Sequence, residues 1–118
     1  MNFLFVEDEI ELLELYEMLL EDMNIDFTLA KNGAEALELI TSKHFDVVFS
    51  DIRMPKMDGF QLLDNIVSNK LDIKKFIFIT AHVDISKEEA TNKGASDILY
   101  KPLGHKVLKE YIRKLMSV

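Results

Sequence analysis

Five polar side chains stand at or just after the ends of short apolar runs, and their functional groups could take part in one reaction. They are two adjacent acids, a third acid, a hydroxyl and an amine, namely Glu7, Asp8, Asp51, Thr80 and Lys101. Clustered carboxylates suit a hard divalent cation such as Mg²⁺, which prefers oxygen ligands in octahedral geometry. A carboxylate can also attack phosphorus to form an acyl phosphate, while a metal, a lysine and a hydroxyl offset charge on the phosphoryl oxygens.

The adjacent acids Glu7 and Asp8 have a simpler interpretation when they are taken alone. Acids are favoured at a helix N-terminus, where free backbone N–H groups and the helix dipole attract negative charge. Asp51 alone would be an ordinary loop acid. The company of Thr80 and Lys101 at the other strand ends favours the metal and phosphoryl interpretation. No glycine-rich phosphate loop follows the first apolar run, which continues as EDEIELLE.

Short runs with strand character alternate along the chain with longer segments of helical apolar spacing. The strand-like runs are residues 2–6, 25–30, 45–50, 75–80 and 97–100. Such alternation predicts a doubly wound α/β domain with a parallel sheet and helices on both faces. The carboxyl ends of parallel strands share one rim, where ligands bind, so the five polar side chains are expected to converge there. Polar and apolar residues alternate in 25–30, which predicts an edge strand.

The helical segments carry their own start and stop signals. Four pairs have the spacing of an N-terminal capping box: Asp8 with Glu11, Asn32 with Glu35, Asp58 with Gln61, and Ser86 with Glu89. Gly94 suits a left-handed residue at a helix C-terminus. The first helix, near 10–23, is expected to place Ile10, Leu13 and Leu20 on one side. The last helix is expected to form one apolar face from Val107, Leu108, Tyr111, Ile112, Leu115 and Met116.

Composition limits the function classes. The chain has 118 residues, 48% of them hydrophobic, and a formal net charge of −7. These values predict one globular domain and argue against binding to nucleic acid or an anionic membrane, which reward clustered basic residues. The sequence has no cysteine, which excludes disulfides, zinc–thiolate sites and thiol catalysis. The start of the chain lacks signal-peptide character and no apolar run approaches roughly 20 residues, so a cytoplasmic protein is expected.

Four stretches together resemble the response-regulator receiver domain of two-component signalling. They are FVEDE at 5–9, FSDIRMPKMDGF at 49–60, FITA at 78–81 and GASDILYKPL at 94–103. The resemblance covers essentially the whole chain, in order and spacing, and implies a single receiver domain over 1–118. It also implies the flavodoxin-like (βα)5 fold with five parallel strands in the order 2-1-3-4-5.

The resemblance implies a role for each residue of the metal and phosphoryl site. Asp51 would be the phosphoacceptor. The carboxylates of Glu7, Asp8 and Asp51 and the backbone carbonyl of Arg53 would hold Mg²⁺. Thr80 would be the switch hydroxyl that moves onto the phosphoryl group, and Lys101 would pair with that group.

The same resemblance assigns residues around the site to switching and tuning. Tyr100 would be an aromatic switch that turns inward as the hydroxyl moves. Ala81 would keep the rim small, and Pro102 would follow a cis peptide that aims the lysine. We also hypothesise that His82 and Arg53, whose side chains flank the site, tune how easily water reaches the phosphoaspartate.

The function implied is phosphoryl transfer from the phosphohistidine of a sensor histidine kinase or a histidine phosphotransfer protein, in a Mg²⁺-dependent reaction. The acyl phosphate would be hydrolysed slowly and would switch the domain towards a downstream effector, which makes it a signalling domain rather than an enzyme. An alternative is a pseudo-receiver, a phosphorylation-independent interaction module. A third is a metal-dependent phosphohydrolase, but such enzymes place an acid where Arg53 stands. The effector, dimerisation on phosphorylation and a stand-alone or excised origin stay open.

Overall fold

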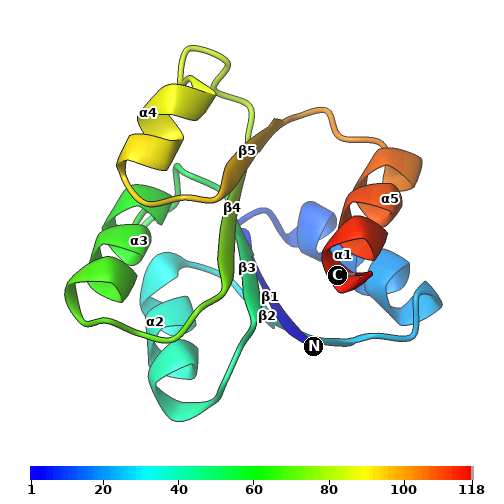
Figure 1. The fold of residues 1–118 in the computed structure, drawn as a ribbon. Helices are drawn as coiled ribbons and strands as arrows, with labels where there is room; N and C mark the ends of the chain where they lie inside the picture. Colours follow the sequence, from blue (N-terminus) through cyan, green and yellow to red (C-terminus); the bar gives the residue numbers. More distant parts are fainter. Residues whose placement is uncertain (118) are drawn as a thin grey trace.

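The computed structural model describes residues 1–117, which fold as alternating strands and helices (Figure 1). The elements are β1 (Asn2–Val6), α1 (Ile10–Asp22), β2 (Asp26–Ala30), α2 (Gly33–Ser42), β3 (Val47–Ser50), α3 (Gly59–Ser68), β4 (Lys75–Thr80), α4 (Lys87–Asn92), β5 (Asp97–Tyr100) and α5 (His105–Met116). The strands are parallel, in the order β2-β1-β3-β4-β5. The predicted fold class and the edge position of the second strand are confirmed.

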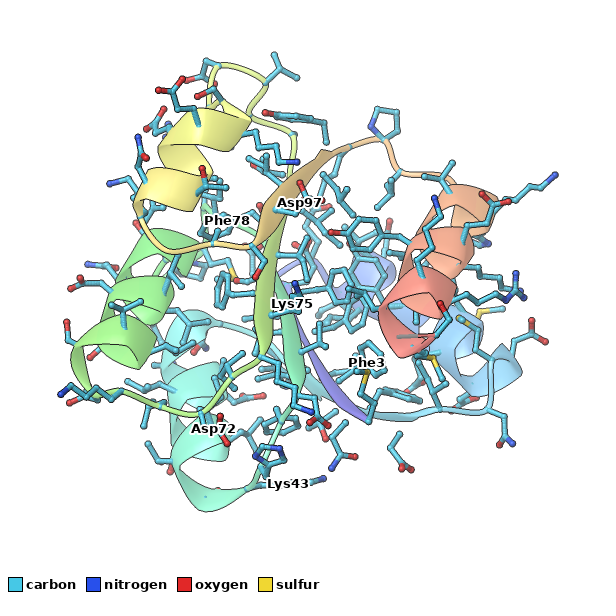
Figure 2. All side chains as sticks on the ribbon, viewed as in Figure 1. Phe3, Lys43, Asp72, Lys75, Phe78 and Asp97 are labelled. Atoms are coloured by element: carbon cyan, nitrogen blue, oxygen red, sulfur yellow. The ribbon has the colours of Figure 1, made fainter. Side chains whose placement is uncertain are left out.

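The sheet separates two layers of helices, with α1 and α5 on one face and α2, α3 and α4 on the other (Figure 1). Successive side chains of a strand point to opposite faces, so each strand supplies both layers. In Figure 2, Phe3 lies on the α5 side and Phe78 lies on the opposite side, and each belongs to a separate buried cluster. The four residues of β3 are all buried, as expected for a central strand covered on both faces.

The buried cluster beneath α1 and α5 is built around aromatic rings. Phe5 stacks on Phe49 with ring centroids 4.6 Å apart, and Tyr16 of α1 lies 4.9 Å from Phe5. Such pairs add a specific geometry to the area that they bury. These contacts hold β1, β3 and α1 together directly below the rim where the site residues stand.

Of the four expected capping boxes, one forms completely and two form only the bond to the N-cap side chain. Asp58 and Gln61 make a complete capping box at α3, and Asn32 and Ser86 each accept a hydrogen bond from the third residue of their helices. The prediction for Asp8 is wrong, because Glu9 precedes α1 and makes no side-chain cap. The carboxylate of Asp8 lies instead with those of Glu7 and Asp51.

The expected apolar faces are only partly correct. Ile10 is 66% exposed, because it opens α1 at the rim, beyond the strand ends. In α5, Leu108 and Ile112 are buried, whereas Val107 and Met116 are 56% and 44% exposed. A helix that packs on one layer covers only a stripe of its surface, so apolar residues at the margins stay in contact with water. Gly94 follows α4 with a φ of +112°, as predicted.

At the amino-terminal ends of the strands, the carboxylate of Asp46 joins three segments. Its Oδ2 accepts a hydrogen bond of 2.7 Å from the backbone N–H of Asn2. Its Oδ1 lies 3.2 Å from Nε2 of His44 and 3.8 Å from Nζ of Lys74. This residue therefore ties the beginnings of β1 and β4 to the segment before β3.

Within residues 1–117, no helix is long and apolar enough to span a bilayer.

Candidate metal and phosphoryl site

The strand register brings the predicted site residues to one rim. Val6 of β1 pairs with Ser50 of β3, so the next residues, Glu7 and Asp51, are neighbours. Thr80 is the last residue of β4 and pairs with Tyr100 of β5, which Lys101 follows. The rim therefore gathers side chains from four strand ends, as the sequence predicted.

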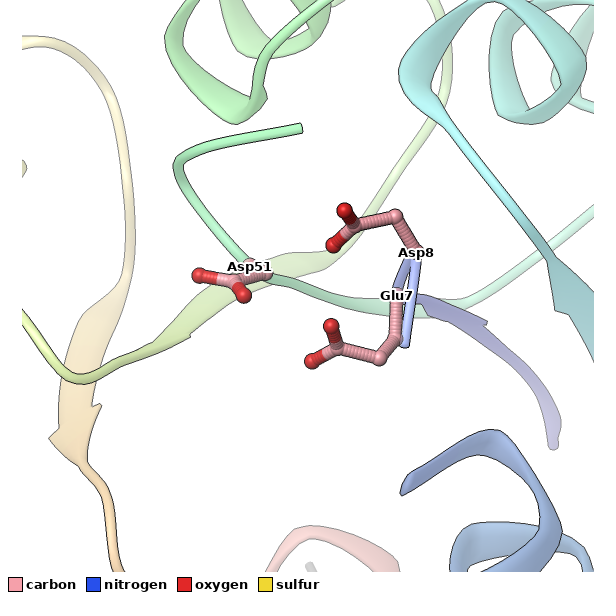
Figure 3. Close-up of side chains that lie close together, drawn as sticks. All are labelled: Glu7, Asp8 and Asp51. Carbon is pink, nitrogen blue, oxygen red and sulfur yellow. The ribbon is translucent and has the colours of Figure 1, made fainter. Parts of the chain in front are cut away.

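Three carboxylates form the acidic part of this rim (Figure 3). One oxygen from each of Glu7, Asp8 and Asp51 lies within 4.8 Å of the others. Glu7 is 1% exposed and Asp51 is 8% exposed, whereas Asp8 is open to solvent. Oxygen donors alone, crowded on one side and open on the other, fit a small hard cation that keeps several waters.

Lys101 lies between the two buried acids. Its Nζ donates hydrogen bonds to Oε1 of Glu7 at 2.8 Å and to Oδ2 of Asp51 at 2.9 Å. The other oxygen of Asp51, Oδ1, accepts a bond of 2.7 Å from the backbone N–H of Ile52. Both oxygens of the predicted phosphoacceptor are therefore held, and the carboxylate has a fixed orientation.

The charges at the rim do not balance, because one ammonium group faces several carboxylates. Burial raises the pKa of Glu7 from 4.5 to about 7, and the negative charge of Asp51 adds to the rise while Lys101 opposes it. Burial also disfavours the charged form of Lys101, but its two carboxylate partners outweigh that effect and raise its pKa. Additional positive charge at the rim would therefore stabilise the ionised form of Glu7.

The predicted switch residues lie on the β4 and β5 side of the site. Thr80 is fully buried, and its Oγ1 accepts a hydrogen bond of 3.1 Å from the backbone N–H of His82. The ring of Tyr100 is partly buried, and its hydroxyl donates to the carbonyl of Ile85 in the segment between β4 and α4. The peptide bond between Lys101 and Pro102 is cis, as the resemblance implied.

Three residues predicted to shape access to the site follow the ends of β3 and β4. Ala81 and Arg53 are exposed, and His82 is half-buried. Arg53 follows Asp51 in the segment that leads to α3, and His82 follows Thr80 in the segment that leads to α4. The two side chains thus stand on different loops that leave the same rim.

The segment from β3 to α3 is held by two glycines, and the role of the first was not predicted. Gly33 donates from its backbone N–H to the carbonyl of Met57 at 3.1 Å, and a Cβ there would lie 2.4 Å from that oxygen. Gly59 donates to the carbonyl of Ile52 at 2.6 Å, and a Cβ there would lie 2.3 Å from the carbonyl oxygen of Asp51. The signal in the sequence was the Asn-Gly pair at a helix start, which permits a close backbone approach.

Comparison with known proteins agrees with this geometry. Residues 3–113 match the response regulator receiver domain family. The DNA-binding transcriptional regulator NtrC of Escherichia coli strain K12 is 40% identical over 98 residues, which are 82% of this chain and 21% of NtrC. The transcriptional regulatory protein ZraR of Klebsiella oxytoca is 38% identical over 103 residues, which are 86% of this chain and 23% of ZraR.

A solved structure extends the similarity to three dimensions. The receiver domain of Francisella response regulator 1452 superposes with a TM-score of 0.85 and 27% identity, covering 99% of this chain and 98% of that one. The chain spans about a fifth of the length of the two curated relatives. A family match over residues 3–113, together with the same fold, leads to one conclusion: the chain belongs to the response regulator receiver domain family of two-component signalling.

Proposed function

We propose that this domain accepts a phosphoryl group on Asp51 and converts the modification into a change at its β4–α4–β5 side. The observation that carries the proposal is the held carboxylate of Asp51, with Nζ of Lys101 at 2.9 Å and two further acids beside it. A carboxylate oxygen attacks phosphorus, the nitrogen–phosphorus bond of the donor phosphohistidine breaks, and the leaving imidazole takes a proton. The product is an acyl phosphate on Asp51.

Mg²⁺ is the proposed cofactor, held by the carboxylates of Glu7, Asp8 and Asp51 and by the backbone carbonyl of Arg53. When bound, it would neutralise charge on the phosphoryl oxygens. Lys101 keeps a positive charge at the rim and would bind another of these oxygens after the aspartate is modified. The hydroxyl of Thr80 would donate to a third oxygen, exchanging its contact with the N–H of His82 for one with the phosphoryl group.

The signal is proposed to leave the site through Tyr100. Its hydroxyl contact with the carbonyl of Ile85 joins β5 to the segment that carries Thr80 towards α4. A movement of Thr80 towards the phosphoryl group would displace this segment and change the place available to the tyrosine ring. Such a device biases two packings of the same elements, and the phosphoryl group supplies the difference in free energy.

The donor is proposed to be a sensor histidine kinase or a histidine phosphotransfer protein in the cytoplasm, on the ground of the family. We further propose that residues 1–118 form one receiver domain that controls a downstream effector. A pseudo-receiver is less well supported, because Asp51 has two acids and Lys101 beside it, and Thr80 ends the neighbouring strand β4. A phosphohydrolase is disfavoured because exposed Arg53 stands where its second acid would be needed.

The test is intact-mass spectrometry after incubation with acetyl phosphate and Mg²⁺. The expected result is one phosphoryl adduct on the wild type, no adduct on Asp51→Asn, and no adduct when the metal is chelated beforehand. A folded wild type that takes no adduct, or an adduct that persists in Asp51→Asn, would refute the proposal. The first of these results would favour the pseudo-receiver.

The proposed tuning by His82 and Arg53 needs a separate measurement. After excess acetyl phosphate is removed, the loss of the adduct is followed over time in His82→Ala, Arg53→Ala and the wild type. Smaller side chains at the opening are expected to speed hydrolysis, because water can approach the phosphorus more freely. Glu88→Ala, an exposed change in α4, is the control. Equal decay in all four proteins would remove both residues from the tuning role.

A further inference from the structure

A cavity of about 450 Å³ lies at the amino-terminal ends of the strands, opposite the metal and phosphoryl site. Its lining includes Val47 at the start of β3, Lys75 at the start of β4, and Tyr111 and Leu115 of α5. Its volume falls in the range of small-molecule sites, which run from roughly 300 to 1,000 Å³ and are mostly apolar with a few polar groups. Nothing in the proposed phosphoryl transfer uses it.

The apolar part of this cavity includes the ring of Tyr111. The tyrosine hydroxyl donates to Oδ2 of Asp97 at 2.6 Å. Burial, with the negative charge of Asp97, raises the pKa of the phenol, so the ring stays neutral. Because its single proton is already donated, Tyr111 offers the cavity an apolar ring beside Leu115 and Val47.

The charged part of the lining is entirely basic. It consists of Lys74, Lys75 and Lys114, and no carboxylate is among the described lining residues. Lys74 lies 3.8 Å from Oδ1 of Asp46, whereas neither Lys75 nor Lys114 forms an ion pair with any residue of 1–117. Lys75 stands on the α5 side of β4 (Figure 2), the side to which Ile77 also points. In a chain of net charge −7, this is a local reversal of sign.

We propose that this cavity binds a small amphiphilic carboxylate, with its apolar body against Tyr111 and Leu115 and its head between Lys75 and Lys114. Charge complementarity selects the head, since the ammonium groups of Lys75 and Lys114 form no ion pair within residues 1–117. The apolar lining supplies the affinity, because each exposed ion pair adds little by itself. The cavity lies at the amino-terminal ends of the strands, whereas Asp51 lies at their carboxyl ends. Its occupancy and the phosphorylation of Asp51 are therefore separate properties.

The experiment titrates the full chain with decanoate, kept below the concentration at which it forms micelles, and follows backbone amide signals by NMR. Saturable shifts are expected at Val47, Lys75 and Leu115. Decylamine, which has the same tail and the opposite charge, is expected to bind at least tenfold more weakly. No saturable shift, shifts centred elsewhere, or equal binding of the amine would overturn the proposal.

Two double variants separate the cationic rim from general charge. Lys75→Gln with Lys114→Gln is expected to weaken decanoate binding roughly tenfold, since two exposed ion pairs are lost. Lys31→Gln with Lys106→Gln removes the same charge from exposed positions outside the cavity and is expected to leave the affinity unchanged. Equal affinities in the two variants would refute the site. The acetyl phosphate adduct is expected in both, so a failure here is distinct from a failure of the proposed function.

Discussion

Lys101 provides the positive charge that partly neutralises the carboxylates of the metal and phosphoryl site. It contacts Glu7 and Asp51 at 2.8 and 2.9 Å, yet it supplies one positive charge to two buried carboxylates. Burial, with the negative charge of Asp51, raises the pKa of Glu7 to about 7, which means that ionised Glu7 destabilises the folded protein near neutral pH. The free-energy cost of ionised Glu7 in the folded state points to a cationic ligand that offsets it.

Glu7→Gln tests this imbalance. The folded-state pKa of Glu7 lies above its ordinary value of 4.5, so the stability of the wild type is expected to fall as pH rises from 4.5 through about 7. Without Mg²⁺ at pH 8, Glu7→Gln is expected to be about 2 kcal/mol more stable than the wild type, and the gap should close below pH 4.5. Urea unfolding across this pH range measures it. A wild type that keeps constant stability between pH 4.5 and 8 would contradict the prediction.

The residue types at the rim were readable from the sequence, but their contacts were not. Strand ends in a parallel sheet share an edge, so the convergence of Asp51, Thr80 and Lys101 followed from the order of elements. The direct bond from Lys101 to Glu7 joins residues 94 positions apart and depends on side-chain reach, which no local pattern encodes. The contact of Tyr100 with Ile85 was missed for the same reason.

At the scale of elements, the segment between β3 and α3 owes its position to the start of α2. Gly33 approaches Met57 so closely that no side chain fits between them. Lys56, just before Met57, has a φ of +68°, so the segment also turns through the left-handed region. The same segment begins with Asp51 and Arg53, so the start of α2 positions the backbone of the candidate metal site.

Gly33→Ala is therefore expected to shift this segment. The new methyl group would sit 2.4 Å from the carbonyl oxygen of Met57, and the variant is expected to lose about 2 kcal/mol of unfolding free energy. Its affinity for Mg²⁺, measured by calorimetry, is also expected to fall. The matched control is Gly104→Ala, where no atom lies within 4 Å of the added carbon, and its effect is expected to be below about 0.5 kcal/mol. Wild-type behaviour of Gly33→Ala would contradict this account.

Asp46 positions backbone segments in a similar way at the amino-terminal ends of the strands. The backbone N–H of Asn2 is the main cause that lowers the pKa of Asp46, and His44 and Lys74 add to it against the effect of burial. The carboxylate therefore stabilises the folded state above its ordinary pKa of 3.8, and this contribution is lost as pH falls through the lower folded-state value.

Asp46→Asn is expected to lose about 1 kcal/mol of unfolding free energy at pH 7, because a charge-assisted hydrogen bond is replaced by a weaker one. The loss is expected to shrink at acidic pH, where the wild-type carboxyl is protonated as well. Chemical unfolding at pH 7 and pH 3 measures both values. A difference between variant and wild type that grows on acidification would contradict the assignment.

The element boundaries and caps were largely predictable because their signals are local. Asn32, Asp58 and Ser86 cap the helices that follow them, and each bond spans three residues. The prediction that Asp8 caps α1 was wrong because its carboxylate lies in a cluster with Glu7 and Asp51, and this placement overrides the local capping preference. Ile10 failed because exposure depends on where the sheet ends, which helical periodicity does not record.

For the whole molecule, binding of a metal at the rim is linked to global stability. A ligand that binds only the folded chain stabilises it in proportion to the logarithm of its concentration, by about 2.7 kcal/mol at a hundred times the dissociation constant. Asp8 is exposed and caps no helix, so its removal disturbs the folded state little. It is therefore suited to separating metal binding from folding.

Asp8→Asn is expected to unfold at nearly the wild-type temperature without Mg²⁺. With saturating Mg²⁺, the wild-type melting temperature is expected to rise by several degrees, while that of Asp8→Asn rises far less. Thermal melts of both proteins with chelator, Mg²⁺ or Na⁺ at matched ionic strength measure the effect. An equal rise in the two proteins would place the bound metal elsewhere.

The six residues of α4 are attached to the rest of the fold by very little. Ala90 is the one buried residue of Lys87–Asn92, whereas α3 buries four. Opening α4 locally would expose little apolar surface, so its amide protons would reach solvent without global unfolding. Helix α4, beside the proposed switch, can thus open locally at little cost to the two buried clusters, to which it contributes Ala90 alone.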